Sequence, residues 1–210
     1  MVQANPKVLS VDEFIADYGD QDHYELIDGE LIDVEPTGLH VREAAQNEQQ
    51  VIGFIARKLN VEIDRLDLPY TIPHRCLIRV SDNTAFRPDV IVLDRTQLIH
   101  EPLWQSQPVI TSSSAIKLIA EVVSTNWQND YARKVEDYAL FGVPEYWIAD
   151  YLGLGGREYI GQPKQPTVTL CQLAGDFYDK RLFQQDERLV SREFPELNLR
   201  ASAVFAAGQL

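Results

Sequence analysis

Residues 116–150 read IKLIAEVVSTNWQNDYARKVEDYALFGVPEYWIAD, and this stretch decides the fold class. The aliphatic and β-branched run at 116–123 is typical of a strand that is covered on both faces. Apolar residues at helical spacing predict a helix over 130–141, which Gly142 ends. The aromatic and aliphatic residues at 145–150 predict the next strand. A strand, a helix and a strand in succession indicate an α/β arrangement.

Two further strands and a long helix are predicted before this stretch. Strands are expected at 76–80 and at 86–93, and the second contains the continuous run Val90-Ile91-Val92-Leu93. Apolar or small residues recur at approximately helical spacing over 41–59, which predicts a long amphipathic helix. Residues 94–115 have the composition of a loop.

The N-terminal segment carries two local signals. Ser10 is followed three residues later by Glu13, the spacing of a capping box, so a short helix is expected to begin there. Within residues 24–34, two short runs are joined by Asp28-Gly29, whose residues tolerate the positive φ of a tight turn. These residues predict a β-hairpin.

The C-terminal third predicts a β meander followed by a helix, because short apolar stretches there are separated by Gly, Pro or Asp. With no internal repeat or linker in view, we expect one α/β domain over residues 1–210. The predicted stretches are those near Glu158, at 167–173, 177–183 and 188–191, and a final helix at 201–207.

The composition is that of a globular protein with a strong excess of acid. The chain has 210 residues, of which 45% are hydrophobic, and its 32 acidic against 19 basic residues give a formal charge of −13. This charge opposes bulk attraction to nucleic acid or to an anionic membrane. Twelve acidic and only two basic residues fall in residues 1–50, so the acidity is mostly N-terminal.

The cysteines and the N-terminus indicate the compartment. Cys76 and Cys171 are far apart and have no CxxC partner, which excludes a zinc cage and a dense disulfide framework. The start MVQANPKVLSVDEF lacks the features of a secretion signal, and no run approaches the roughly 18 apolar residues of a membrane helix. We therefore expect a cytoplasmic protein without a membrane partner.

Two carboxylates occupy hydrophobic strands, where a lone buried acid is costly. Asp89 directly precedes the run at 90–93, and Glu121 lies inside the run at 116–123. On neighbouring strands, the two could share a divalent cation with water and the backbone carbonyl of Val122, because Mg²⁺ requires hard oxygen ligands. Such an ion activates water and stabilises charge on a phosphodiester. The alternative is structural, with Asp89 partly solvated and Glu121 in an ion pair.

The order of five motifs resembles a widespread bacterial family of restriction-endonuclease-like proteins of otherwise unknown function, within the PD-(D/E)XK nuclease superfamily. The resemblance extends over about residues 20–200, and the combination is specific although each motif alone is weak. The motifs are ELIDGEL at 25–31, FRPDVIV at 86–92, EVVS at 121–124, KVEDY at 134–138 and GVPEYWIAD at 142–150.

The resemblance implies a restriction-endonuclease-like core, in which a helix precedes a mixed β-sheet flanked by helices. It also implies that Asp89 and Glu121 bind metal while a lysine positions or activates the attacking water. The lysine of the superfamily's E-x-K motif would fall at Val123, whose aliphatic side chain cannot orient water. In the narrower family the lysine comes from the following helix, where Lys134 matches. Alternatively, Lys134 forms an ordinary surface pair with Asp130 at i, i+4 spacing.

Several other residues are weaker candidates. Glu25 matches a glutamate of the family and is an auxiliary candidate near the metal, or simply a solvated or paired strand residue. His40 matches a family histidine that could cap the helix or contact substrate, although a lone histidine there is usually structural. Glu43 and Glu48 lie on the long helix, where the superfamily often places an extra acid and where a solvated glutamate is the ordinary alternative. Tyr138 is expected to pack.

The first functional hypothesis is a Mg²⁺- or Mn²⁺-dependent endonuclease that hydrolyses DNA phosphodiester bonds. Asp89 and Glu121 would hold the metal, and Lys134 would assist the attacking water. The second hypothesis is a catalytically silent nuclease-fold module that binds nucleic acid or protein, which Val123 and the acidic charge favour. A small-molecule phosphoesterase or a purely structural protein has less support.

The expected partner is DNA, bound weakly and in a salt-sensitive way. The charge around Asp89 is near neutral, and Arg75, Arg79 and Arg87 are available to hold phosphate. The acidic N-terminal residues lie away from the proposed metal ligands in sequence. Cutting both strands usually needs two copies of a nuclease site, which favours a homodimer, although no residue in the sequence demonstrates one.

Overall fold

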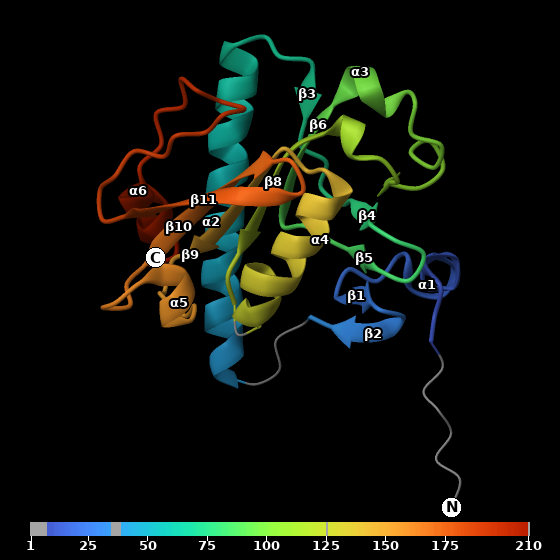
Figure 1. Ribbon diagram of the computed structural model, residues 1–210, viewed down its shortest axis with the longest axis horizontal. Coiled ribbons are helices and arrows are strands. Elements are labelled where there is room, and N and C mark those ends of the chain that lie inside the picture. The colour runs from blue at the N-terminus through green and yellow to red at the C-terminus, as the bar shows by residue number, and fades with distance from the viewer. Residues whose placement is uncertain (1–7, 35–38, 125, 210) are drawn as a thin grey trace, which may run out of the picture.

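The computed structural model describes residues 8–34, 39–124 and 126–209, apart from the side chains of residues 39–44. Its strands form two sheets, and helices lie around them (Figure 1). The smaller sheet has the order β2 (Glu30–Asp33), β1 (Tyr24–Ile27), β5 (Ala85–Phe86), β4 (Leu77–Arg79), β7 (Val109–Ile110). The larger sheet has the order β11 (Phe177–Gln184), β10 (Thr167–Ala174), β9 (Glu145–Asp150), β8 (Ile116–Val122), β6 (Val90–Asp94), β3 (Tyr70–Thr71).

The larger sheet is mixed, as the family resemblance implied. Strand β8 pairs antiparallel with β6 and parallel with β9. Strands β9, β10 and β11 are consecutive antiparallel neighbours, so the predicted C-terminal meander is confirmed for its stretches at 167–173 and 177–183. The larger sheet therefore combines one parallel crossover with a meander.

The crossover between β8 and β9 is the predicted strand, helix and strand. It begins with a π-helical turn, Asn129–Arg133, and continues as α4 (Lys134–Phe141). Gly142 ends the helix with φ 93°, a left-handed conformation that a residue without a Cβ adopts at little cost. The helix thus begins close to where the sequence predicted it, but its first turn is wider than an α-helical turn.

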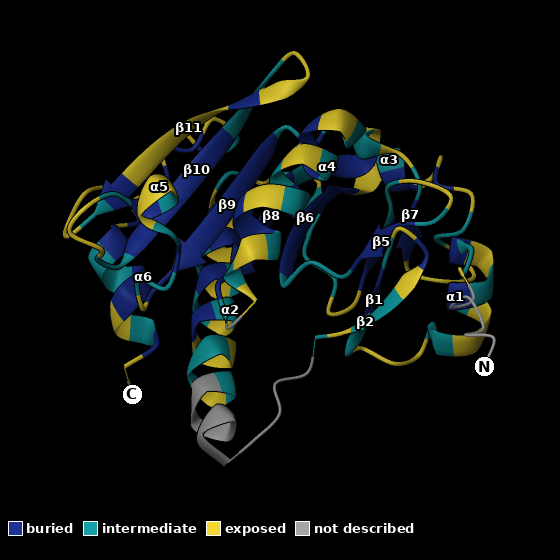
Figure 2. Ribbon diagram, turned by 60° about the horizontal axis from the view of Figure 1, so that its bottom comes forward, coloured by how far each residue is buried: buried dark blue, intermediate teal, exposed yellow. Residues whose placement is uncertain are grey.

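Helices cover both faces of the larger sheet. The long helix α2 (Leu39–Arg65), which extends beyond the predicted 41–59, packs against one face together with α6 (Ala201–Ala207). Helix α4 packs against the other face. Alternation along β6 divides its side chains, so that Val90 and Val92 join the cluster with α2 while Ile91 and Leu93 join that with α4. Figure 2 shows β8 and β9 as buried strands, which agrees with their two-sided cover.

The N-terminal elements form as their local signals predict. Helix α1 (Val11–Tyr18) has a complete capping box, in which Ser10 and Glu13 each satisfy a backbone N–H of the other. Asp28 and Gly29 take φ values of 53° and 81° in the hairpin between β1 and β2. A third apolar cluster joins α1 to the smaller sheet.

The predicted strand at 86–93 is divided between the two sheets. Residues 85–86 belong to β5 in the smaller sheet and residues 90–94 to β6 in the larger sheet, with Arg87-Pro88-Asp89 between them. Proline has no backbone N–H to contribute to a sheet, which explains the break at this place. Asp89 consequently lies where the chain passes from one sheet to the other.

Three smaller predictions differ from the structure. The stretch near Glu158 is a short helix, α5 (Arg157–Ile160), rather than a strand. Residues 188–191 contribute one isolated bridge, between Arg188 and Arg200, instead of a strand. The expected loop at 94–115 contains α3 (Arg95–Leu98), β7 and a 3₁₀ turn at Ser113–Ala115. Each element is too short for periodicity to reveal it.

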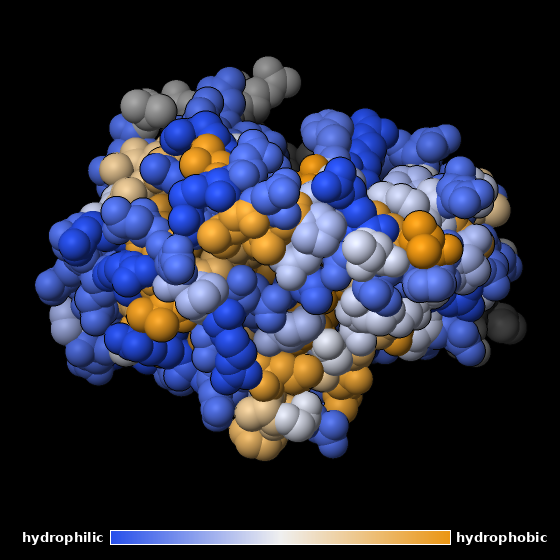
Figure 3. Space-filling model, turned by 90° about the horizontal axis from the view of Figure 1, so that it is seen from above, coloured by the Kyte–Doolittle hydropathy of each residue, from blue (hydrophilic) through white to orange (hydrophobic). Residues whose placement is uncertain are grey.

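The surface is mostly hydrophilic on the face that Figure 3 shows, where hydrophobic patches are separate from one another. In the part of the chain that the structure describes, no helix is long and apolar enough to cross a membrane. Cys76 and Cys171 are both buried and free of a disulfide.

Candidate active site

Glu121 lies on β8, and Asp89 lies opposite it, directly before the neighbouring antiparallel strand β6. Val90 pairs with Ala120 in the antiparallel register. This register places Asp89, which precedes Val90, beside Glu121, which follows Ala120. Both carboxyl side chains fall on the face that α4 covers, because residues two apart share a face of a strand. The register therefore brings together the two acids that the sequence singled out.

Two backbone hydrogen bonds hold the two carboxyls in place. The N–H of Asp89 donates to Glu121 Oε2 at 3.3 Å, and the N–H of Val122 donates to Asp89 Oδ2 at 2.7 Å. These two hydrogen bonds bring the two carboxyls together at the carboxyl end of β8.

Lys134 reaches this pair from the first position of α4. Its Nζ lies 3.1 Å from Glu121 Oε1, 3.2 Å from Glu25 Oε1 and 3.6 Å from Asp130 Oδ1. The Lys134 side chain is only 8% exposed, and Nζ lies 5.7 Å from the centroid of the Phe86 ring. The alternative of an ordinary surface pair with Asp130 is therefore wrong, because the ammonium is buried among three carboxyls.

Tyr138 supports Glu121 from the next turn of α4. Its hydroxyl donates to Glu121 Oε1 at 3.0 Å, so one carboxylate oxygen accepts from both Lys134 and Tyr138. The ring is fully buried and packs edge-on against Phe86 and Tyr146. The predicted packing is confirmed, and the hydrogen bond to Glu121 is an addition that the sequence did not reveal.

Glu25 is a buried partner in the site and not a solvated strand residue. It is 2% exposed, and its Oε1 accepts the N–H of Arg87 at 3.1 Å in addition to contacting Lys134. The Arg87 guanidinium donates to the carbonyls of Tyr18, Gly19 and Tyr24. Arg87 therefore joins α1 and the hairpin to the segment that carries Asp89.

Two further acids lie in the site: Glu48, a weaker candidate from the sequence, and Asp130, which the sequence indicated only as a partner of Lys134. Asp130 is buried at the π-helical turn beside Lys134, and burial raises its pKa. Burial, together with the charges of Asp130 and Glu121, raises the pKa of Glu48 to about 7. The only sequence signal for Glu48 was its place on a helix that often carries an extra acid in the superfamily.

Two of the helical candidates lie outside the described side chains. His40 and Glu43 belong to α2, but the structure describes their backbone alone. Their proposed contacts with metal or substrate stay predictions.

Burial dominates the protonation of the site. It raises the pKa of Asp89 to about 7, against the opposing effects of the Val122 N–H and the Lys134 charge. Burial also raises the pKa of Glu121. For Lys134, burial favours the neutral amine, but Glu121, Glu25 and Asp130 outweigh it and hold the pKa well above its ordinary value. Lys134 is consequently an ammonium at neutral pH and a donor, not a proton acceptor.

The donor set of the site fits a hard divalent cation. Five carboxyl groups, from Glu25, Glu48, Asp89, Glu121 and Asp130, interact with a single ammonium, so the acidic groups outnumber the basic one. From the described residues, neither Asp89 Oδ1 nor the Glu48 carboxyl receives a hydrogen bond. Oxygen donors with free capacity suit Mg²⁺ or Mn²⁺. The described part of the chain holds no preformed group of three or more His, Cys, Asp or Glu side chains for a metal, so a carbonyl and water would complete the shell.

Comparisons with known proteins identify the family and the fold of the chain. A family model described as Uma2, putative restriction endonuclease, matches residues 11–202, a range that contains all five motifs. The crystal structure of a putative nuclease belonging to DUF820 from Anabaena variabilis ATCC 29413 has a similar fold, with a TM-score of 0.67 and 16% sequence identity. The alignment covers 95% of this chain and 99% of that chain. The comparison with curated proteins found no match.

Proposed function

The chain belongs to the Uma2 family of putative restriction endonucleases, as its motifs predicted, and we propose that it is a metal-dependent endonuclease that hydrolyses DNA phosphodiester bonds. The observation that carries this proposal is the pairing of Asp89 with Glu121 on neighbouring strands, with Lys134 bound to Glu121 at 3.1 Å. Two carboxyls and a lysine on one face of a mixed sheet are the parts that such hydrolysis requires.

The proposed ligands of Mg²⁺ or Mn²⁺ are the carboxyls of Asp89 and Glu121 and the carbonyl of Val122. Glu48 is a further acid whose charge interacts with that of Glu121. When bound, the ion supplies Lewis-acid stabilisation of a phosphoryl oxygen and lowers the pKa of water. The protein itself contributes the fixed position of the donors, which the backbone hydrogen bonds at 89 and 122 maintain.

Lys134 acts as a positively charged donor in this proposal. As an ammonium, it can donate to the attacking water or to a phosphate oxygen and offset the charge that develops there. Glu25 and Tyr138 are positioning residues, because Glu25 contacts Lys134 Nζ at 3.2 Å and Tyr138 donates to Glu121 at 3.0 Å. Helix α4 thereby supplies the cation that the strand lacks at Val123.

The test is cleavage of plasmid, duplex and single-stranded DNA with Mg²⁺ or Mn²⁺ by the wild type and by Asp89→Asn. The variant should lose at least about 100-fold in rate, since it removes a charged group placed at the reacting phosphate. Asp94→Asn is a matched control, because Asp94 lies at the other end of β6 and bonds to Thr96. It should cleave like the wild type. Metal-dependent cleavage undiminished in Asp89→Asn would reject the assigned site.

A catalytically silent module that binds nucleic acid or protein is the second candidate function. Val123 at the place of the E-x-K lysine favours it. Calorimetry separates the two functions, because the silent module would bind DNA or a protein without binding a divalent ion at Asp89 and Glu121. Heat from Mg²⁺ or Mn²⁺ binding that disappears in Asp89→Asn would favour the enzyme.

We also propose that residues 1–210 form one domain, that the protein acts in the cytoplasm, and that two copies associate where both DNA strands are cut. A single domain predicts one cooperative thermal transition, and two copies predict a doubled mass by light scattering in the presence of duplex DNA. Two separate transitions, or double-strand cleavage by a strict monomer, would contradict these proposals.

A further inference from the structure

A cavity of about 250 Å³ opens beside Asp89, where the chain crosses between the two sheets. Its lining includes Asp22 from the turn before β1, His74 and Arg75 from the connection between β3 and β4, and Arg87. The cavity therefore brings two arginines and a histidine to the same lining as Asp89, a proposed metal ligand. No part of the site described above uses Arg75 or His74.

Arg75 is the cation in this cavity that can change its partner. It binds Asp22 through Nη2 and Oδ2 at 2.7 Å, and the two side chains are 53% and 50% exposed. An ion pair this exposed contributes little to stability, so its exchange for another anion costs little. Arg87, in contrast, is fixed by backbone carbonyls of Gly19 and Tyr24.

The remaining lining is suited to an anion. His74 is exposed and has no hydrogen-bond partner among the described residues. Arginine binds phosphate through two parallel N–H donors, which is stronger and more specific than a contact with a solvated carboxylate. Arg75 should therefore bind a phosphate in the cavity more strongly than it binds the exposed carboxylate of Asp22.

We propose that this cavity is a subsite for a backbone phosphate of the polynucleotide strand next to the phosphate that is cleaved. Arg75 exchanges Asp22 for the phosphate, and His74 lies close enough in the chain to add a donor. This inference rests on the proposed function, because it places the reacting phosphate at Asp89. It also explains how a chain of charge −13 holds an anionic strand at one place.

The test measures binding of a fluorescent oligonucleotide by anisotropy over a range of salt concentrations, with Ca²⁺ present to occupy the acidic site. Arg75→Gln should weaken binding by about 3- to 30-fold and lower the slope of log K against log salt by about 1. Asp22→Asn should strengthen binding, because it removes the carboxylate that competes with phosphate for Arg75. A gain in affinity cannot result from misfolding.

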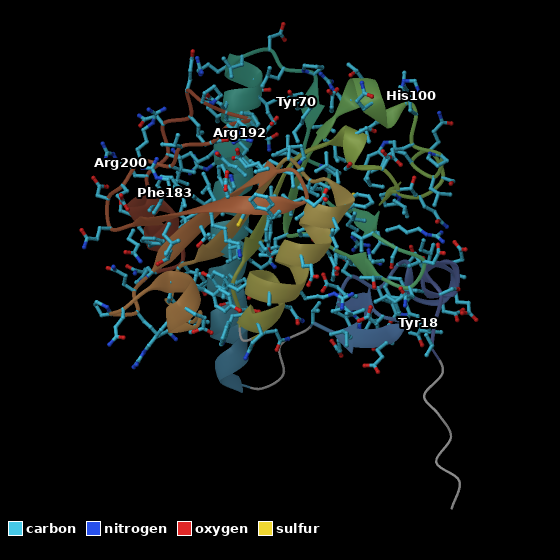
Figure 4. All side chains as sticks on the ribbon, in the orientation of Figure 1. Tyr18, Tyr70, His100, Phe183, Arg192 and Arg200 are labelled. Atoms are coloured by element: carbon cyan, nitrogen blue, oxygen red, sulfur yellow. The ribbon has the colours of Figure 1, made fainter. Side chains whose placement is uncertain are left out.

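Arg200→Gln is the matched control. Arg200 is also 53% exposed and binds an exposed aspartate, Asp186, at 3.0 Å. Figure 4 shows Arg200 at the opposite side of the molecule from Tyr18, whose carbonyl accepts a hydrogen bond from Arg87, a residue of the cavity lining. Loss of one positive charge there should leave the affinity and the salt slope unchanged. Equal weakening by Arg200→Gln would overturn the inference, since net charge alone would then account for the effect of Arg75→Gln.

Oligonucleotides with and without a 5′-phosphate distinguish a backbone phosphate from a terminal one. The expected result is the same loss in Arg75→Gln for both, whereas a loss confined to the phosphorylated strand overturns the backbone assignment. If the wild type cleaves DNA but Arg75→Gln and Asp22→Asn bind as it does, the subsite is wrong and the proposed function stands. If the wild type neither binds nor cleaves DNA, both are wrong.

Discussion

Replacing Lys134 by Met should destabilise the protein by an amount that increases with pH. The ammonium is 8% exposed and lies 3.1 Å and 3.2 Å from the carboxyls of Glu121 and Glu25. Methionine has a similar length and keeps the apolar stem packed on Phe86, so the loss is that of the charge. Removing one partner of a buried ion pair usually costs about 3–5 kcal/mol, because the other charge is left without compensation.

The pH dependence follows because a stranded carboxyl can bind a proton instead. Protonating a glutamate with an ordinary pKa of 4.5 costs about 1.4 kcal/mol for each pH unit above that value. The cost of protonating the stranded carboxyl is an upper limit on the loss of stability. It is about 1.4 kcal/mol at pH 5.5 and about 5 kcal/mol at pH 8. The folded variant then holds more protons than the unfolded chain, so its stability falls as the pH rises. We expect a loss of about 1 kcal/mol at pH 5.5 and about 3–5 kcal/mol at pH 8.

Urea denaturation of both proteins at pH 5.5 and pH 8, without divalent ions, measures this difference. Lys117→Met is the control, because Lys117 pairs with Asp94 at 3.6 Å and its side chain is 26% exposed. It should lose less than about 1 kcal/mol at both pH values. The reasoning is refuted if Lys134→Met loses less than about 1 kcal/mol at pH 8, or the same amount at both pH values.

Two further outcomes are expected. Because burial raises the pKa values of Asp89 and Glu48 to about 7, the metal-free site holds protons below pH 7 that a cation must displace. The affinity for Mg²⁺ should therefore rise from pH 6 to pH 8, with proton release seen by calorimetry in two buffers; a pH-independent affinity would contradict this. Glu145 is fully buried and accepts from Trp147 Nε1 and Ser191 Oγ, both at 2.6 Å, so Glu145→Gln should lower the free energy of unfolding by about 2–4 kcal/mol. A loss below about 1 kcal/mol in urea would show that the C-terminal loop does not depend on this carboxylate.

The pairing of Asp89 with Glu121 could be predicted because Asp89 directly precedes one hydrophobic run and Glu121 interrupts another. Each strand fixes the face of its own residues through alternation, so only the register between the strands was unknown. The pairing of Val90 with Ala120 supplies that register. Lys134 was predicted from the family resemblance, and its helical position alone was equally consistent with a surface pair.

Glu25, Glu48 and Asp130 could not be assigned to the site from periodicity. They belong to a hairpin, a long helix and a π-helical turn, and only tertiary packing brings these elements together. Periodicity reports which face of an element is apolar, but the three acids lie where faces of different elements meet. The Arg87 contacts that join α1 and β1 to this place have no local sequence signal either.

The location of these acids shows that part of the net negative charge of the chain belongs to the candidate site. Glu25 and Glu48 belong to the acidic first fifty residues, which lie far from Asp89 in sequence, yet Glu25 contacts Lys134 at 3.2 Å and Glu48 is close enough to Glu121 for the charges to interact. Part of the acidity is therefore a property of the site and not of a remote surface. A bound divalent ion would neutralise the carboxyls that lie closest to the proposed phosphate position. The affinity for DNA should therefore increase with the concentration of that ion by more than the screening of surface charges accounts for.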